Sequence, residues 1–586
     1  MNQTPFGFYL SYLKEFKKEA LLASFLGMAN GIIAVYMTRL IGLGIDTMIG
    51  KDKVHFDVLF SILALFGGLT LLNSLAQWTI QRLGNKVAYT AVATVRKDTF
   101  YHLNRLPIHF YDQTAHGDVV SRFSNDLDQV AEATTAVFNS VFSGVTIVFI
   151  SLGSMLLLSP LLTIVVLLST ALIFLVNWSV AKKSQQQFQQ QQAILGSISG
   201  FLEEDVAGLK IIKGAQGEQE SLIRFNSLNE TLQQVGQKAQ FMSSLTNPLS
   251  RFVDHVSYLS IGVIGGLLVI NQTPGMTIGV ISSFIIYSTQ FSKPFIELSG
   301  ILTQIQTAFA SLQRVFNLTQ EPLETRDAQE PQILPPLKGR ITFKDVSFAY
   351  VPSQPLIQGF NLTVQAGQTV AIVGQTGAGK STLVNLLMRF YEVDQGVISI
   401  DGIPIQQMTR KELRQSFGMV LQETWLFKGS IWDNLTFGRP DATKEDVIQA
   451  CQEAAIYHFI TTLPKGFDTI IGQGNLSLSE GQRQLMTIAR VIISQPNMLI
   501  LDEATSSIDT LTEKTIQRVF TNLMVGKTSF IIAHRLSTIK EADTILVMHQ
   551  GNIVEIGNHD SLVIKQGGYY QELYNAQFTQ KERANL

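Results

Sequence analysis

The sequence predicts an α-helical membrane domain of six long transmembrane helices, followed by a soluble α/β domain built around a phosphate loop. Of the 586 residues, 46% are hydrophobic and only 15% are charged. The mean hydropathy is +0.20, which is too apolar for a soluble enzyme of this length. Six apolar runs in the first half are each long enough to cross a hydrocarbon core of about 30 Å. In the second half, residues 374–382 match the pattern G-x-x-x-x-G-K-[ST].

The charge balance and the cysteine content narrow the range of partners. The formal net charge is -2 at pH 7, so the chain has no overall basic field and no nucleic acid is expected as a partner. Cys451 is the single cysteine, which excludes a disulfide within the chain. We expect a packed core thiol in a reducing compartment.

The apolar runs and the links between them predict the membrane topology. The runs are at residues 20–49, 56–83, 134–158, 161–181, 248–270 and 276–300. Links 84–133 and 182–247 are long and rich in Lys and Arg, whereas the other three are short, so the long links and both termini are expected in the cytoplasm. Residues 6–18 combine aromatic side chains with lysines, which indicates an amphipathic helix on the cytoplasmic face.

The two long links are predicted to be helices that continue beyond the bilayer and turn back. Both show helical spacing and almost no proline. Residues 107–128 and 201–217 are the candidate turns. From the pattern alone, these turns are equally well read as contact regions or as solvated helix tips.

A proline-rich stretch separates the two domains. We expect a membrane domain at residues 1–318, a linker at 319–339 and a nucleotide-binding domain at 340–586. Within the last, helices are expected at 382–389, 442–463 and 567–577. Strands are expected at residues 340–346, 362–364, 369–373, 397–400, 417–421, 498–501, 529–532 and 544–548.

The phosphate loop follows a predicted strand and opens a predicted helix, as phosphate binding requires. Its residues are Gly374, Gln375, Thr376, Gly377, Ala378, Gly379, Lys380, Ser381 and Thr382. The glycines let backbone N–H groups point at phosphate oxygens. Lys380 is expected to reach the β- and γ-phosphates and Ser381 to bind Mg²⁺. ATP and Mg²⁺ are therefore the expected cofactors.

Two carboxylates come directly after the apolar strand at 498–501. Asp502 is expected to hold Mg²⁺, directly or through water, and Glu503 to activate the attacking water as general base. An isolated Asp-Glu pair is more often a helix N-cap, but the preceding strand and the phosphate loop favour catalysis. His534 also ends an apolar strand; a lone histidine is usually structural, so a contact with the γ-phosphate depends on its context.

At this point the chain resembles the ABC transporters. The stretch Leu478, Ser479, Glu480, Gly481 and Gln482 resembles their signature, which is usually Leu-Ser-Gly-Gly-Gln. By the same resemblance, Gln422 is the Q-loop residue that serves catalysis and Mg²⁺, Tyr350 stacks on adenine and His534 is the switch histidine. The D-loop comprises Ser506, Ser507, Ile508 and Asp509. The two turns look like the coupling regions of ABC exporters, which favours contact with nucleotide-binding domains.

The resemblance implies a half-transporter of the type IV exporter fold, which works as a dimer. In this family, ATP lies between the phosphate loop of one domain and the signature of the other, and its binding closes the dimer. The expected activity is ATP-driven export of hydrophobic or amphipathic compounds across the cell membrane, as in bacterial multidrug exporters. A lipid or peptide exporter is the alternative, and an ATP-gated channel or signalling protein is a third class.

One departure from the family pattern bears on the partner. Glu480 replaces the usual third-position glycine of the signature, and Gln473, Gly474 and Asn475 lack the usual acidic-Gly pattern. A carboxylate directed at the partner's γ-phosphate would be repelled by it, whereas an exposed orientation would cost far less. With Glu503 intact, the chain resembles the hydrolysis-competent subunit of heterodimeric bacterial multidrug exporters. The expected partner is a second half-transporter with a degenerate catalytic carboxylate.

Several ionisable side chains lie in or near the predicted spans. Such groups are unfavourable in lipid and are expected to face a cavity, a partner helix or an interface. Snorkelling or local ion pairing near span ends is an equally good explanation for the basic ones. The residues are Arg39, Arg251, Asp254, His255, Lys293 and Glu297.

Overall fold

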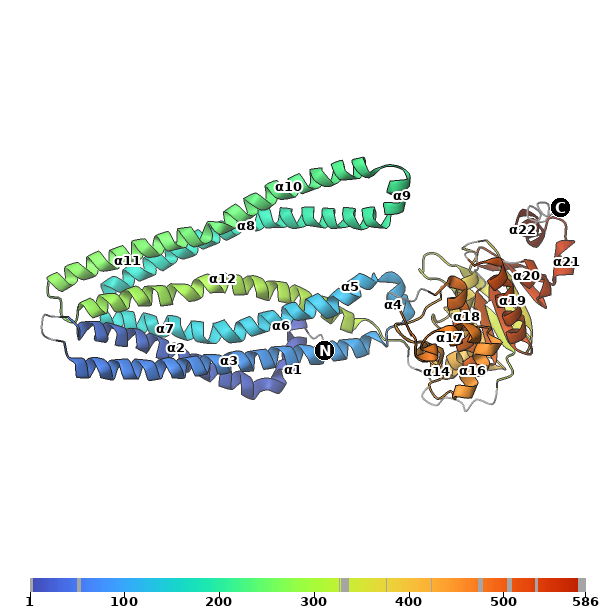
Figure 1. Cartoon of the computed structure of the whole chain (residues 1–586), viewed down its shortest axis with the longest axis horizontal. Coiled ribbons are helices and arrows are strands. Elements are labelled where there is room, and N and C mark those ends of the chain that lie inside the picture. The colour runs from blue at the N-terminus through green and yellow to red at the C-terminus, as the bar shows by residue number, and fades with distance from the viewer. Residues whose placement is uncertain are drawn as a thin grey trace. The chain divides into compact units, whose positions relative to one another are not determined.

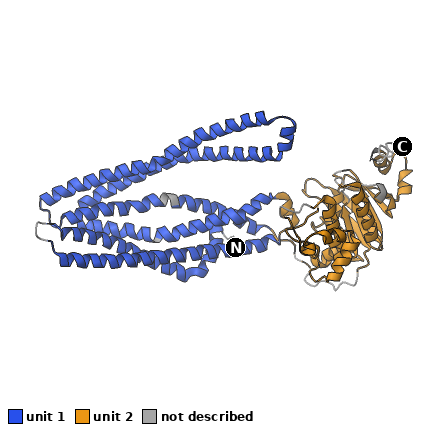
Figure 2. Ribbon diagram, in the orientation of Figure 1, with its two compact units in different colours: residues 1–105, 114–321 blue, residues 106–113, 322–586 orange. Residues whose placement is uncertain are grey.

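The computed structural model describes residues 4–49, 54–325, 327, 337–375, 377–422, 424–472, 478–502, 508–532 and 536–577. The chain divides into two compact units (Figure 2). The first, a helical unit, comprises residues 1–105 and 114–321. The second, a mixed α/β unit, comprises residues 106–113 and 322–586. The second unit therefore includes a short segment from the first predicted cytoplasmic turn.

The helical unit is built from long helices that run side by side (Figure 1). Two π-helical turns, η2 and η3, interrupt the third of them. The elements are α1 (Pro5–Leu13), η1 (Lys14–Phe16), α2 (Lys17–Asp46), α3 (Phe56–Leu103), α5 (His116–Ser121), η2 (Arg122–Asp126), α6 (Leu127–Ala136), η3 (Val137–Val141), α7 (Phe142–Leu158), α8 (Pro160–Ala207), α9 (Leu209–Gly214), α10 (Glu218–Ser244), α11 (Thr246–Ile270) and α12 (Ile278–Gln320).

Five helical stretches within the described residues are long and apolar enough to cross a membrane; four contain a predicted span, and the first, Pro5–Asp46, covers all but the last three residues of span 20–49. The predicted sixth span lies in α12, which is 43 residues long but is not among the five. Its polar side chains are bonded to neighbouring helices: the hydroxyl of Tyr287 donates to the Val35 carbonyl at 3.1 Å. Because α12 packs against α2, α7, α8 and α11, it needs less apolar surface. Its membrane crossing remains a prediction.

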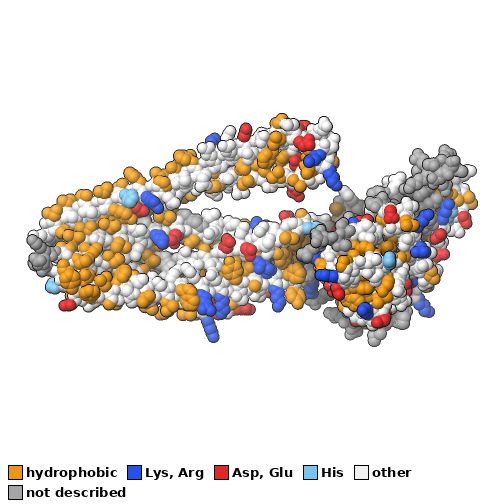
Figure 3. All heavy atoms as spheres, viewed as in Figure 1, with side chains coloured by type: hydrophobic (Ala, Val, Ile, Leu, Met, Phe, Trp, Pro, Cys, Tyr) orange, Lys and Arg blue, Asp and Glu red, His pale blue; other side chains and the backbone are white. Residues whose placement is uncertain are grey.

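Two of the helices are long enough to continue beyond a membrane core, which is what the sequence predicts for them. At 1.5 Å per residue, α3 and α8 are roughly 70 Å long, more than twice the thickness of the hydrocarbon core. Hydrophobic side chains cover the surface around α11 and the beginning of α3, while charged side chains lie mainly over the extensions (Figure 3). The turn at α9 lies within residues 201–217, where it was expected.

The N-terminal helix α1 lies against the extensions. The hydroxyl of Tyr9 is hydrogen-bonded to that of Thr134 at 2.9 Å, and Tyr12 donates to Asp98 at 3.0 Å. Nearby, Arg314 of α12 pairs with Asp126 of η2 through two nitrogens. Burial opposes ionisation of Asp126, but the bonds from Arg314 and Ser311 hold its pKa below the ordinary value. These contacts attach the first predicted cytoplasmic turn to α12.

The α/β unit contains a mainly parallel sheet and a smaller antiparallel one. The six-stranded sheet has the order β12-β11-β3-β10-β9-β6, and the four-stranded sheet has the order β2-β1-β4-β5. The strands are β1 (Ile341–Phe348), β2 (Ile357–Val364), β3 (Thr369–Val373), β4 (Gln395–Ile400), β5 (Ile403–Pro404), β6 (Phe417–Val420), β7 (Gly429–Ser430), β8 (Ile470–Ile471), β9 (Met498–Asp502), β10 (Thr528–Ile532), β11 (Thr544–His549) and β12 (Asn552–Gly557).

Both faces of the six-stranded sheet are covered, one by helices and the other by the smaller sheet together with the helix that follows β3, so the central strands are apolar throughout. In β3, Ala371 and Val373 join one core, while Val370 and Ile372 join the other. The helices and helical turns of this unit are α4 (Ile108–Gln113), α13 (Lys380–Leu387), η4 (Ile405–Gln407), α14 (Arg410–Gln415), α15 (Ile431–Leu435), α16 (Lys444–Glu453), α17 (Tyr457–Thr462), η5 (Gly466–Asp468), α18 (Glu480–Ser494), α19 (Thr510–Met524), α20 (Leu536–Glu541), α21 (His559–Val563) and α22 (Tyr569–Gln577).

Most predicted elements of this unit are confirmed, one predicted helix is wrong, and several observed elements were not predicted. The expected helix at 442–463 is wrong as a single helix, because Ala455 has a φ of 57° and separates α16 from α17. The edge strand β12 was not predicted; it pairs antiparallel to β11. Cys451 is buried as expected, and burial raises the pKa of its thiol to about 12.

The short helix α4 belongs to the α/β unit. The hydroxyl of Tyr391 donates a hydrogen bond to the carboxylate of Asp112, and the Tyr391 and His109 rings lie 6.0 Å apart, edge to face. Burial and the Asp112 carboxylate both raise the pKa of Tyr391. One part of the predicted turn at 107–128 therefore contacts the nucleotide domain of its own chain.

Candidate nucleotide site

Four of the predicted functional segments follow four neighbouring strands of the parallel sheet. Strand β10 pairs with β3 and with β9, and β9 pairs with β6, all in parallel. The register aligns Ile372 with Ile532, Ile532 with Asp502, and Leu501 with Val420. The phosphate loop, the segment of His534, the segment of Glu503 and the segment of Gln422 therefore begin at one edge of the sheet, where ligands bind in parallel α/β folds.

At several positions of the phosphate loop, the backbone conformation or the surrounding atoms allow only glycine. Gly377 and Gly379 have φ values of 83° and 96°, a region that side chains disfavour. A Cβ on Gly374 would lie 2.4 Å from the carbonyl oxygen of Met548. Lys380 begins α13, so Ser381 and Thr382 lie in the first turn, where N–H groups and the positive end of the dipole favour an anion. The geometry suits a nucleotide phosphate.

Lys380 curls back into this loop. Its Nζ donates to the carbonyl oxygens of Gly374 and Gln375 at 2.7 and 3.1 Å. Burial lowers the pKa of Lys380, while the negative charge of Asp502 opposes that shift. The ammonium and the Asp502 carboxylate are thus close enough to interact, as a site for phosphate and a metal ion requires.

Tyr350 lies beside the helix that follows the loop. Its hydroxyl is hydrogen-bonded to Thr382 Oγ1 and to the amide of Asn385, both at 3.2 Å. Its ring packs edge to face against Phe348 and Tyr391, with centroids 4.8 and 4.9 Å away. These contacts hold a partly exposed aromatic ring next to the phosphate loop, where a base can stack.

The signature residues form the start of α18. Ser479 is the N-cap: its Oγ accepts from the Gln482 N–H at 3.2 Å, and Gln482 Oε1 accepts from the Ser479 N–H at 2.9 Å. This capping box fixes the first turn. A Cβ on Gly481 would lie 2.4 Å from Thr512 Cγ2 and 3.4 Å from Ile508 Cγ2. Glycine here lets the signature pack against the start of α19.

Glu480 is engaged by its own domain. Its carboxylate accepts a hydrogen bond from Thr424 Oγ1 at 3.0 Å and pairs with Arg483. The bonds from Arg483 and Thr424 lower the pKa of Glu480, against the effect of burial. The carboxylate also lies in the first turn of α18, where negative charge is favourable. Its charge is therefore compensated within its own domain; the repulsion expected if the carboxylate is directed at the partner's γ-phosphate stays a prediction.

Two of these contacts were missed from sequence. Thr424 stands two residues after Gln422, so the Glu480 contact links the signature helix to the Q-loop segment. Nothing in the residue pattern indicates that pair. The pair with Arg483 is an i,i+3 contact, and helical spacing provided a usable signal for it.

The D-loop helix begins next to the signature. Asp509 is the N-cap of α19, and its Oδ1 accepts from the Thr512 N–H at 2.9 Å. This bond lowers the pKa of Asp509. Several predicted site residues lie outside the described residues: Thr376, Gln473, Gly474, Asn475, Glu503, Ser506, Ser507 and His534.

The chain does not join the two halves of the predicted site. Among the residues described, no hydrogen bond or ion pair connects Leu478, Ser479, Glu480, Gly481 or Gln482 to the phosphate loop. The signature helix instead packs against α15, α16, α19 and β6. One chain thus carries a phosphate-binding half and a separate signature half.

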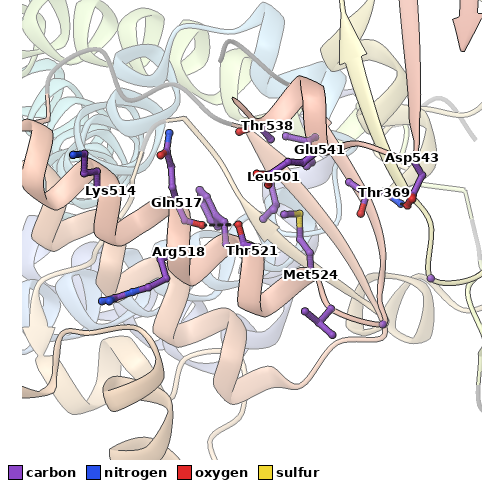
Figure 4. Close-up of a pocket in the computed structure, with 15 residues that line it drawn as sticks. Thr369, Leu501, Lys514, Gln517, Arg518, Thr521, Met524, Thr538, Glu541 and Asp543 are labelled. Atoms are coloured by element: carbon purple, nitrogen blue, oxygen red, sulfur yellow. Dashed lines mark hydrogen bonds between the residues drawn. The ribbon is translucent and has the colours of Figure 1, made fainter. Parts of the chain in front are cut away.

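A cavity of about 490 Å³ elsewhere in the domain is distinct from this site. It is lined by α19, α20, the residues at or just before the starts of β3, β10 and β11, and the side chains of Leu501 and Ile531. Thr369 and Asp543 meet there, with the Thr369 N–H donating to Asp543 at 2.8 Å (Figure 4). That edge of the sheet is opposite the phosphate loop, so the cavity is not the nucleotide site.

The fold and the site together define a membrane protein fused to a nucleotide-hydrolysing domain. Residues 20–295 match the family model of the ABC transporter transmembrane region, and residues 357–506 match the ABC transporter model. The chain therefore belongs to the ABC transporters and is homologous to exporter half-transporters. It is an ATP-binding, ATP-hydrolysing translocase and a multi-pass membrane protein.

The relatives carry different substrate descriptions. The fatty acid ABC transporter ATP-binding/permease protein of Mycobacterium bovis is 41% identical over 528 residues, 90% of this chain and 83% of that protein. The uncharacterised ABC transporter ATP-binding protein YfiC of Bacillus subtilis is 37% identical, over 97% of this chain and 93% of its own. The probable multidrug resistance protein YheH of the same species is 34% identical, over 89% and 77%.

Proposed function

We propose that the protein exports hydrophobic or amphipathic compounds across the cell membrane, using ATP and alternating access. The main support for this proposal is that one chain contains both five candidate membrane-spanning helices and a nucleotide half-site at the carboxyl edge of a parallel sheet. The long cytoplasmic extensions and the α4 contact with Tyr391 supply a route for coupling. Both termini lie in the cytoplasm in this proposal, because the long links carry the basic residues.

The residue roles follow the chemistry of phosphoryl transfer. Lys380 and the loop N–H groups hold the phosphates, and Tyr350 stacks on the base. Mg²⁺ is held by Ser381, Asp502 and Gln422, and it neutralises charge on the transferred phosphoryl group. Glu503 activates water, and His534 contacts the γ-phosphate. The register of β3, β10, β9 and β6 supports this assignment.

A second half-transporter completes the site. The separation of the signature from the phosphate loop supports a dimer in which each ATP is shared between chains. We propose a heterodimer in which this chain hydrolyses ATP and its partner has a degenerate catalytic carboxylate, on the ground of the altered signature. A homodimer is the second candidate, favoured by the local compensation of Glu480 by Thr424 and Arg483.

Replacing Glu480 by glycine distinguishes the heterodimer from the homodimer. If this chain's signature faces a weak site, we expect the Glu480→Gly complex to retain or exceed the basal ATPase rate of the unaltered complex. If the signature faces a hydrolysing site, the lost bond to the Q-loop segment should lower the rate several-fold. Glu480→Gln tests the charge separately, because it keeps the side-chain length. Inactivation by Glu480→Gly as complete as that by Glu503→Gln would contradict the asymmetric dimer.

The substrate class is drawn from the relatives and from the apolar character of the spans. Amphipathic drugs are the first candidate, by analogy with the B. subtilis relative described as a probable multidrug resistance transporter. A lipid-type substrate is the alternative, supported by the relative described as a fatty acid transporter.

Reconstitution tests the proposal directly. In liposomes containing the purified dimer, we expect ATP to drive dye movement in one direction and amphipathic compounds to stimulate the ATPase at least about twofold. A parallel assay with dodecanoic acid tests the alternative that the substrate is a lipid. ATPase activity without vectorial movement of any of these compounds would contradict the export function.

A further inference from the structure

Hydroxyl groups line the junction of α8, α11 and α12 inside the predicted membrane region. Ser250 donates to Asn177 Oδ1 at 2.7 Å, and Ser257 bonds to Ser169 at 3.0 Å. Ser257 also lies 3.4 Å from Ser288 of α12. Further along, Thr170 and Ser292 are 2.9 Å apart. These bonded hydroxyl and amide groups form a polar seam between the three helices.

Asp254 lies in this seam. It is four residues after Ser250 and three before Ser257, so the three share one face of α11. The opposite face is an exposed apolar stripe that extends on both sides of Asp254: Leu249, Phe252, Val256, Leu259, Val263, Leu267 and Ile270. Because that stripe is suited to lipid, the Asp254 carboxyl lies at membrane depth.

The Asp254 carboxylate has no ion-pair partner among the described residues. Its Oδ1 atom is shielded from solvent and has no hydrogen-bond partner, and no ion pair to Asp254 occurs within the part of the chain that the structure describes. Lys293 of α12 is paired with Glu297 at 3.7 Å. Arg251 and His255 flank Asp254 on α11 and are both exposed. His255 is close enough to interact electrostatically with Asp254, but neither residue forms an ion pair with it.

A carboxylate in such surroundings is costly unless it is protonated or a positive charge reaches it. Isolated carboxylates in a medium of low dielectric constant are strongly disfavoured, and ionisable groups in spans face a cavity, a pathway or a partner. The seam itself supplies hydroxyl groups that already bond to one another, so it does not neutralise the charge. A cation that arrives from outside the chain would.

We propose that Asp254 binds the positively charged group of a transported amphipathic cation. This rests on the proposed export function and deepens it: the site selects cationic over neutral amphipathic compounds and disfavours fatty acid anions. The positive charge of the compound would meet the Asp254 carboxylate in the seam, on the face of α11 that packs against α8 and α12.

The test uses two probes of nearly the same shape, tetraphenylphosphonium, which is a cation, and triphenylphosphine oxide, which is neutral. The assembled dimer in liposomes is assayed for the probe concentration that gives half-maximal ATPase stimulation. Asp254→Asn keeps the size of the side chain. We expect it to raise this concentration at least about tenfold for tetraphenylphosphonium, and to change it less than about twofold for the neutral probe.

Two further variants keep the result interpretable. Glu297→Gln removes a carboxylate that is already paired with Lys293, so its effect on both probes should stay below about twofold. Asp254→Glu should preserve the preference for the cation, which a purely structural role of Asp254 does not require. If Asp254→Asn changes the half-maximal concentration equally for both probes, as expected if only a proton occupies the site, the inference is overturned. It is also overturned if the substitution affects neither probe.

Failure of the inference can be told from failure of the export function. If both probes stimulate the unaltered protein, and the ratio of their half-maximal concentrations is the same in Asp254→Asn, the Asp254 site is rejected but the export function is not. No stimulation of the unaltered protein by any amphipathic compound rejects the proposed function and, with it, the site.

Discussion

The Lys380→Ala variant is expected to lower ATP turnover by about 100-fold or more and to weaken ATP binding. The ammonium is the only lysine charge in the described part of the phosphate loop, and it is held there by the Gly374 and Gln375 carbonyls. Removal of one preorganised charge at a transferring phosphoryl group typically costs about 10²- to 10³-fold in rate. Steady-state ATPase assays and binding of a fluorescent ATP analogue measure the two effects.

Lys527→Ala is the matched control for this experiment. Lys527 precedes β10 in the same domain, and burial lowers its pKa as it does for Lys380. The loop that contains Lys527 lies away from the carboxyl edge of the sheet. Replacing Lys527 should therefore change ATP turnover by less than about twofold. If Lys380→Ala retained more than about a tenth of the activity, the phosphate-binding role of Lys380 would be wrong.

Glu503→Gln should abolish hydrolysis while ATP binding persists. A general base contributes about 10²- to 10⁴-fold to such reactions, and the substitution removes the proton acceptor without removing the phosphate loop. We therefore expect ATPase activity to fall at least about 100-fold and the variant to retain bound ATP after gel filtration. This result differs from that of Lys380→Ala, which should lose the nucleotide as well.

Glu445→Gln provides the comparison for the Glu503 variant. Glu445 is exposed in the first turn of α16, and its amide variant should hydrolyse ATP at the unaltered rate. In the proposed heterodimer, the Glu503 change in this chain alone is sufficient to stop turnover. Residual hydrolysis within about tenfold of the unaltered dimer would assign the general base to another residue or to the partner.

Strong local patterns predicted most of the fold. Apolar runs, basic links and the phosphate loop carry their meaning within a few consecutive residues, and the structure confirms the long helices and the parallel strands they predicted. The sequence signals were weaker at the edge of the sheet and at breaks within helical patterns. A left-handed residue, Ala455, ended α16 within a helical pattern, and the edge strand β12 lacked the continuous apolar run of the central strands.

The candidate site shows the same division. The order of the strands was not readable from spacing, yet it is the register of β3, β10, β9 and β6 that brings four distant segments to one edge. The environment of Glu480 was also inaccessible, because Thr424 is 56 residues away in sequence. The fold gives the Glu480 carboxylate two partners in its own domain, of which only Arg483 was within reach of helical spacing.

The sequence by itself determined the class of this protein: an apolar helical half, a phosphate loop and a signature motif, each defined by side chains that are neighbours along the chain. Only the tertiary structure decided which charges are satisfied. Pairing Glu480 with Thr424 and Arg483, and leaving Asp254 in a polar seam without an ion-pair partner among the described residues, depend on packing between distant helices and loops. Electrostatic free energy depends on the distance between charges in space, and sequence spacing reports that distance only within a single helix or strand.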